Sequence, residues 1–114
     1  MERGIESGLT LTEEQAIEKI RALGFHPVVV EVPPADNEFH WHDFDSVFYI
    51  LERGLDVTDM ETGQTVSIVE GDWVNAPGGF AHREKHDGFK AVFGVSVDPE
   101  TLQFPLERPL PVTA

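Results

Sequence analysis

The pattern that most constrains the fold is a series of short apolar runs separated by turns, from Phe25 to Val97. The runs are rich in valine and aromatic residues, and Gly, Pro, Asn and Asp punctuate them. No stretch between them is long enough for a further helix. Even spacing of this kind predicts an all-β, antiparallel sandwich or barrel. The expected strands cover residues 25–32, 38–42, 46–51, 54–60, 64–69, 73–76, 81–85 and 89–97.

One short helix is expected before the strands, at residues 12–23. Thr12 followed three residues later by Gln15 is a capping-box signature for its start. Apolar residues then recur at helical spacing, and Gly24 supplies the stop. These apolar residues are Ala16, Ile17, Ile20 and Leu23.

The last segment, residues 98–114, is expected to be an extended arm because it contains four prolines, which cannot donate to a sheet ladder. Its apolar residues predict that it packs, either across its own barrel or against a second subunit in a homodimer. We interpret residues 1–114 as a single domain with the barrel at residues 25–97.

Charge and composition narrow the function classes. The net charge of −13 opposes binding to nucleic acid or to an anionic membrane surface. The chain has no cysteine, so disulfides and thiolate metal sites are excluded. Residues 1–10 contain no apolar run like that of a signal peptide, and no stretch reaches transmembrane length. A cytoplasmic location is the expectation.

Four of the five histidines fall in two tight groups, His40-Trp41-His42 and the stretch from His82 to His86. Imidazole is the commonest protein ligand for first-row metals. His40 and His42 would point the same way on a strand, because side chains alternate between its faces. Together with a histidine from another strand they could converge on one ion.

The same residues resemble the two motifs of the cupin family. The first motif is similar to His40-Trp41-His42 followed by the run from Ser46 to Gly54. The second is similar to Gly71, then Pro77-Gly78-Gly79, then His82. The resemblance implies a jelly-roll barrel that holds a divalent metal through His40, His42 and His82. It does not specify a reaction, because a fold does not determine function.

Two positions depart from the family pattern. Where the first motif usually has a glutamate ligand, this chain has Ser46 and Val47, and a neutral hydroxyl is a poor replacement for a carboxylate. Asp45 is a possible substitute ligand, although a regular strand would turn it to the opposite face. The expected site is therefore three imidazoles without a carboxylate, which would favour an anionic substrate.

The second departure is His86, where the family usually has asparagine. On a regular strand, Glu84 and His86 share the face of His82, so both are candidate cavity-lining catalytic residues. His86 could alternatively be a polar turn residue beside Asp87-Gly88.

The expected cofactor is a divalent transition metal, with Fe(II) favoured and Zn, Ni, Mn or Cu as alternatives, since imidazole selects weakly among them. Within the family resemblance, a metal-dependent dioxygenase acting on a small organic molecule is the leading hypothesis, followed by an isomerase or lyase. The alternative is a non-catalytic cupin that binds or senses a small molecule or metal through a degenerate site.

Overall fold

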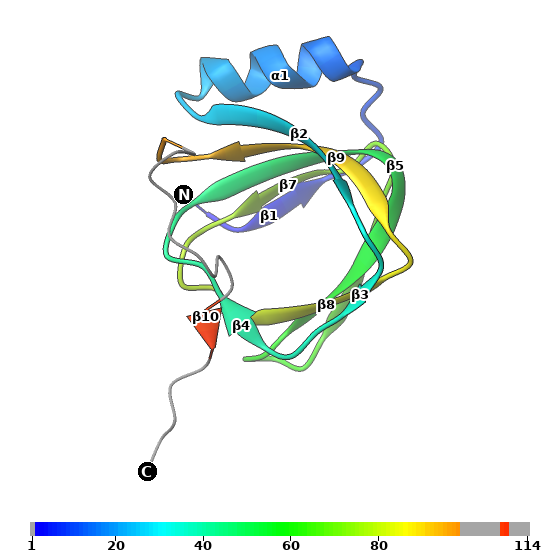
Figure 1. Ribbon diagram of the computed structural model, residues 1–114, viewed down its shortest axis with the longest axis vertical. Helices are drawn as coiled ribbons and strands as arrows, with labels where there is room; N and C mark the ends of the chain where they lie inside the picture. Colours follow the sequence, from blue (N-terminus) through cyan, green and yellow to red (C-terminus); the bar gives the residue numbers. More distant parts are fainter. Residues whose placement is uncertain (1, 99–107, 110–114) are drawn as a thin grey trace.

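The chain forms an antiparallel β-barrel with one helix on its outside (Figure 1). The computed structural model describes residues 2–98 and 108–109. The predicted fold class, mainly antiparallel β with a short N-terminal helix, is confirmed. The elements are β1 (Gly4–Glu6), α1 (Glu13–Ala22), β2 (His26–Val32), β3 (Ala35–Asp36), β4 (His40–Trp41), β5 (Ser46–Asp59), β6 (Thr65–Val69), β7 (Trp73–Ala76), β8 (His82–His86), β9 (Phe89–Val95) and β10 (Arg108–Pro109).

The barrel consists of two sheets that share β5. In the first sheet the strand order is β1-β7-β5-β9-β2, and α1 covers its outer face (Figure 1). In the second sheet β5 pairs with β6 and β8, while β8 also pairs with β3 and β4. The two sheets therefore enclose an interior between them, and the second sheet carries His40, His82 and His86.

The prediction of two separate strands at residues 46–51 and 54–60 is wrong, because β5 runs unbroken through this region. The pairing with β9 shifts register between Ile50 and Glu52, and Arg53 has a positive φ of 65°. A bulge of this kind bends a strand and increases its twist, which carries β5 from one sheet into the other. Arg53 Nε donates to Gly88 O at 2.9 Å and holds this corner.

Alternation along β5 divides the apolar residues between two layers. Val47 and Tyr49 face α1 and pack with the fully buried Ala16 and Ile20. The Tyr49 hydroxyl donates to Leu9 O at 3.0 Å, so Tyr49 lies away from the histidines. The opposite face of β5 lies toward the barrel interior. The buried apolar cluster there combines residues of β5, β6, β7 and β9, namely Phe48, Ile50, Leu55, Ile68, Val74, Phe89 and Ala91.

The helix begins and ends close to the predicted positions. Thr12 Oγ1 accepts from Gln15 N at 3.1 Å, and Gln15 Oε1 accepts from Thr12 N at 2.9 Å. This reciprocal capping box satisfies two backbone donors that would otherwise lack partners. Leu23 forms the C-cap.

Three very short strands, β1, β3 and β10, were not expected from the sequence. Most of the predicted arm at residues 98–114 lies outside the described residues. Its described segment β10 pairs through the backbone with β4 of the same barrel. A contribution of the arm to a homodimer stays a prediction. Within the described part of the chain, no helix is long and apolar enough to cross a membrane.

Candidate metal centre

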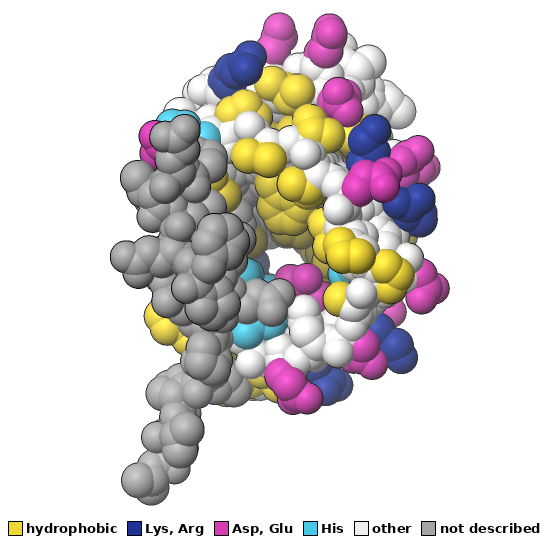
Figure 2. Space-filling model, viewed as in Figure 1, with side chains coloured by type: hydrophobic (Ala, Val, Ile, Leu, Met, Phe, Trp, Pro, Cys, Tyr) yellow, Lys and Arg dark blue, Asp and Glu magenta, His cyan; other side chains and the backbone are white. Residues whose placement is uncertain are grey.

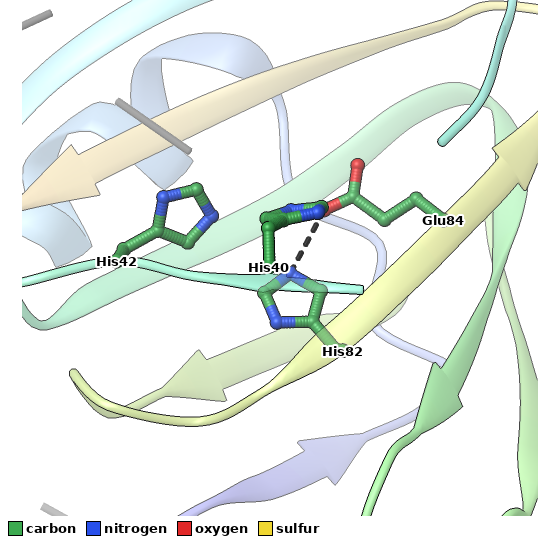
Figure 3. Close-up of side chains that lie close together, drawn as sticks. All are labelled: His40, His42, His82 and Glu84. Carbon is green, nitrogen blue, oxygen red and sulfur yellow. Dashed lines mark hydrogen bonds and ion pairs between the residues drawn. The ribbon is translucent and has the colours of Figure 1, made fainter. Parts of the chain in front are cut away.

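Four potential metal ligands converge on the inner side of the second sheet (Figure 3). They are His40 of β4, His42 just after it, and His82 and Glu84 of β8. One ligand atom from each residue lies within 4.8 Å of the others. Nitrogen and oxygen donors at such separations could hold one metal ion.

Strand pairing explains why two distant parts of the sequence meet here. His40 lies directly opposite His82 in the antiparallel pairing of β4 with β8. Directly opposed residues place their side chains on the same face of the sheet. A step of two residues, from His40 to His42 and from His82 to Glu84, adds the other two side chains to this face. The ring centroids of the three histidines are 4.6–5.4 Å apart.

The Pro77-Gly78-Gly79 turn ties the two histidine segments together. Gly79 N donates to His42 O at 2.8 Å, and Gly78 N donates to Asp45 Oδ1 at 2.7 Å. Gly79 has a φ of +83°, and a Cβ on Gly78 would meet the Phe44 backbone at 3.2 Å. The glycines therefore allow a backbone path and a close approach that other residues would disturb.

Backbone hydrogen bonds orient two of the imidazoles. His40 Nδ1 donates to Glu38 O at 2.8 Å, and His82 Nδ1 donates to Phe80 O at 2.9 Å. A carbonyl oxygen only accepts, so Nδ1 carries the hydrogen in both rings. In a neutral ring, Nε2 then offers its lone pair to the centre of the cluster. This is how metal-binding histidines are commonly fixed by groups around the site.

Glu84 brings a carboxylate close to these Nε2 atoms. Its Oε1 lies 3.0 Å from His82 Nε2 and 3.8 Å from His40 Nε2 (Figure 3). Burial by itself would raise the pKa of Glu84, but the contacts with His40 and His82 outweigh it and hold this pKa well below its usual range. Glu84 is therefore an anion at neutral pH.

Glu84 adds a carboxylate to the three expected imidazoles, so the residues that could hold a metal ion include one more ligand than the sequence predicted. The sequence placed Glu84 on the cavity face of β8 but did not connect it with the metal. Ser46, at the family's glutamate position, is buried and lines the same cavity, and its Oγ donates to Ala76 O at 3.5 Å. The short side chain of Ser46 suits a site whose carboxylate comes from another strand.

Asp45, the other suggested carboxylate, is not one of the four clustered residues. Its Oδ1 accepts from Gly78 N, and its backbone N donates to Ser96 Oγ at 3.1 Å. Asp45 thus connects the segment before β5 to the Pro77-Gly78-Gly79 turn. Its position outside the cluster agrees with the one-residue step that turns it away from the ligand face.

His86 is also outside the cluster, although it lies on the same strand as His82. Its Nδ1 accepts from Gly88 N at 3.1 Å, and its ring meets Phe89 edge-on with centroids 4.8 Å apart. The Nε2 atom is buried without a hydrogen-bond partner among the described residues. These contacts match the alternative of a turn residue beside Asp87-Gly88 better than an acid–base role at the metal centre.

Asn37 is a site residue that the sequence did not indicate. Its Oδ1 accepts from Glu84 N at 2.8 Å, and its backbone N donates to Glu84 O at 3.1 Å. The two bonds hold the backbone of Glu84 from the segment before β4. No sequence signal could have found this contact, because Asn37 lies in an irregular segment far from Glu84 in sequence.

A small cavity of 80 Å³ lies inside the barrel beside the cluster. His42, His82 and Glu84 form its polar wall, and the rest is mainly apolar. Figure 2 shows the hollow of the barrel, with hydrophobic side chains above and histidine and acidic side chains below. The other lining residues of the cavity are Ser46, Phe48, Leu55, Val57, Ile68, Val74, Ala76, Phe80, Phe89 and Phe93.

No protein-family model matches the chain, and no curated protein matches its sequence. Solved structures do match. A DUF861 family protein from Thermotoga maritima has a TM-score of 0.59 and 24% identity, over 81% of this chain and 97% of that one. The polyketide cyclase RemF from Streptomyces resistomycificus has a TM-score of 0.56 and 19% identity, over 78% of this chain and 62% of that one.

A cupin-2 domain containing protein from Shewanella frigidimarina has a TM-score of 0.50 and 21% identity, over 62% of this chain and 68% of that one. Likeness at such low identity shows the fold and not the activity. Together with the two motifs and the histidine cluster inside the barrel, these matches show that the chain has the cupin fold.

Proposed function

We propose that this protein binds a divalent transition metal through His40, His42, His82 and Glu84 and is a metal-dependent enzyme that acts on a small organic substrate. The single observation that carries the proposal is the approach of Glu84 Oε1 to His82 Nε2, at 3.0 Å. In a neutral His82 both atoms are acceptors, because Nδ1 already carries the hydrogen. Two acceptors at this distance need a cation between them.

A proton can fill that role in the metal-free protein, and a metal ion can replace it. Three imidazoles and one carboxylate fit Fe(II), Zn(II), Ni(II), Mn(II) or Cu(II), and we favour Fe(II). Such an ion, when bound, would supply Lewis acidity and, in the case of iron, redox chemistry with dioxygen. Four protein ligands would leave positions free on a six-coordinate ion. Dioxygenase chemistry is therefore our first candidate, with isomerase or lyase chemistry second.

The chain's own residues would set the conditions for this chemistry. The Nδ1 bonds of His40 and His82 keep their Nε2 atoms directed inward. The carboxylate of Glu84 offsets one positive charge, so the site attracts anions less than three imidazoles alone would. The apolar wall around the cavity limits the amount of water beside the ligands, which strengthens electrostatic interactions there.

A non-catalytic metal-binding or sensing cupin is the second candidate. It is favoured by the volume of the cavity beside the ligands, 80 Å³, which is small for an organic substrate. Both candidates require the metal, so they differ only in turnover.

Elemental analysis of untagged protein, followed by calorimetric titration with Fe(II) under anaerobic conditions and with Zn(II) or Ni(II), tests metal binding. We expect about one ion per chain. Failure to bind any of these metals would contradict the proposal. Screening of the Fe(II) protein against small carbonyl and hydroxyl compounds, by oxygen consumption for a dioxygenase and by product analysis for an isomerase or lyase, then separates the candidates, because only an enzyme gives turnover that disappears in His82→Ala.

A further inference from the structure

The metal cavity is too small to enclose an organic substrate. Its volume is only 80 Å³. Sites for small organic molecules usually measure about 300–1,000 Å³. A substrate that reaches the metal ligands must therefore place most of its volume elsewhere.

A second pocket of 310 Å³ adjoins this cavity, and we call it the seam pocket because it lies where the edge strands of the two sheets, β1 and β6, face each other. Its floor and sides are mostly apolar. Ile5 of β1 and Val66 of β6 line its two sides. It shares five wall residues with the metal cavity, namely Val57, Ile68, Val74, Ala76 and Phe80.

Phe80 connects the seam pocket with the metal ligands most directly. Its ring stacks on that of His82, with centroids 5.0 Å apart and an interplanar angle of 12°. The Arg3 guanidinium lies 4.3 Å from the centroid of the Phe80 ring. Arg3 lines only the seam pocket and His82 only the metal cavity, so Phe80 stands between the two spaces.

The charges in the seam pocket indicate which molecules it would accept. Arg3 and Asp59 are the ionisable residues among its described lining, and they form an ion pair at 2.9 Å. The paired guanidinium leaves little attraction for an anion. Behind Phe80, the negative charge of Glu84 would offset part of the charge of a bound divalent ion, which weakens the attraction of the site for an anionic ligand. Amide and hydroxyl groups of Gln64, Asn75 and Thr62 offer neutral hydrogen bonds.

We propose that the seam pocket binds the apolar body of a small, uncharged organic substrate, whose polar end reaches the metal ligands past Phe80. This inference rests on the proposed metal-dependent function. It assigns the substrate class as uncharged and largely apolar, with a hydroxyl or carbonyl group at one end. It also makes Phe80 a residue that controls access from the pocket to the metal.

The test uses the full-length protein and two probes of similar size, 4-fluorophenol and 4-fluorobenzoate, followed by ¹⁹F NMR at pH 7. The phenol is neutral at this pH and the benzoate is an anion. We expect the phenol to bind at least about tenfold more tightly than the benzoate, since only the anion loses its hydration without gaining a partner. In the Mn(II)-loaded protein, the bound phenol should show a broadened ¹⁹F line.

Two filling variants and one control locate the probe. Val66→Trp and Ile5→Trp fill the pocket from opposite strands at positions 45% and 43% exposed, so the fold should accept them. Each should weaken phenol binding by at least about tenfold, because the ring takes the space of the probe. Val69→Trp lies on the same strand as Val66, is 54% exposed and does not line the pocket, so it should leave binding unchanged.

A Phe80→Ala variant tests the wall. It should retain the metal and increase the Mn(II) broadening of the bound phenol, because the probe can then approach the ion. Equal effects of Val66→Trp and Val69→Trp, tighter binding of the benzoate, or unchanged broadening in Phe80→Ala would overturn the inference. Loss of a dimer in Val66→Trp by light scattering would also overturn it and assign the seam to a contact between copies. Calorimetric metal titration separates the two proposals, because intact metal binding without these probe effects rejects only the pocket.

Discussion

The two ends of β8 carry histidines on the same face of one strand, yet they have opposite hydrogen-bonding arrangements. At the first end, His82 Nδ1 donates to Phe80 O, so Nε2 faces the Glu84 carboxylate with a position between the two atoms that a proton or a metal ion can occupy. At the other end, His86 Nδ1 accepts from Gly88 N, so the hydrogen of the neutral ring lies on the buried Nε2. Only His82 can present a lone pair to a metal without rearrangement.

The comparison shows that the backbone around a histidine decides whether it can be a ligand. The Pro-Gly-Gly turn places a carbonyl two residues before His82, while the Asp87-Gly88 turn places an N–H two residues after His86. The surroundings of the two rings also differ, since His82 lies beside a carboxylate and His86 is in a T-shaped contact with the apolar ring of Phe89. Spacing along a strand reveals neither difference.

The largest effect is expected from exchanging each of these histidines for alanine. His82→Ala should weaken Zn(II) or Ni(II) binding by about 100-fold or more, because it removes a direct ligand, whereas His86→Ala should change it less than about threefold. Calorimetric titration of both variants at pH 7.5 measures the difference. Comparable losses in the two variants would mean that His86 also belongs to the site.

Removal of the carboxylate should have the next largest effect on the metal. Glu84→Gln keeps the size of the side chain but loses its charge, and we expect metal affinity to fall by about 10- to 100-fold. Asp45→Asn is the matched control, because Asp45 bonds the Gly78 backbone and not the cluster. A larger loss of affinity in Asp45→Asn than in Glu84→Gln would restore Asp45 as the ligand.

Acid should lower the free energy of unfolding of the metal-free protein, because it protonates Glu84 beside His82. The folded-state pKa of Glu84 lies below its ordinary value of 4.5, so its contribution to stability is complete above that pH and is lost as the pH falls below it. Urea unfolding at pH 6 and pH 3.5 should show a smaller decrease for Glu84→Gln than for wild type. Glu31→Gln, on a side chain 68% exposed, should retain the wild-type decrease. Identical decreases in all three proteins would show that the charge of Glu84 does not contribute to the loss of stability in acid.

The smallest effect is expected from Asn37, which holds the backbone of Glu84. Asn37→Ala removes one acceptor and should cost about 1 kcal/mol of unfolding free energy. We also expect metal affinity to fall by roughly threefold to tenfold, since groups around metal ligands position them. Thr58→Ala, which loses an exposed side-chain contact with Thr65, is a control for the general cost of a lost hydrogen bond. If both variants keep wild-type metal affinity, Asn37 has only a structural role.

Most of the barrel could be predicted because its strands have regular local signals. The run at residues 73–76 matches β7, and the capping box at Thr12 marks the start of α1. The errors occur where local signals end. Two strands were expected at residues 46–51 and 54–60, whereas tertiary pairing with β6 and β9 keeps β5 continuous through a bulge. Strands as short as β3 have no periodic pattern, because their pairing partners alone define them.

In the candidate site, too, some residues could be predicted from local sequence signals and others could not. His40, His42 and His82 could be proposed from strand periodicity and from the resemblance to the two cupin motifs. The place of Glu84 in the cluster could not be predicted, since Ser46 occupied the expected carboxylate position and nothing in the sequence relates Glu84 to it. The hydrogen bonds between Asn37 and the Glu84 backbone could not be predicted either, because the two residues are 47 positions apart in sequence.

By itself, the sequence determined the barrel class, the face on which the histidines lie and the absence of thiolate ligands, because these follow from alternation and composition. Only the tertiary structure decided which carboxylate completes the cluster, which nitrogen of each histidine is available and where the cavities lie. The carboxylate and the cavities depend on strand register. The available nitrogen depends on the backbone conformation beside each histidine, which residue types alone do not specify.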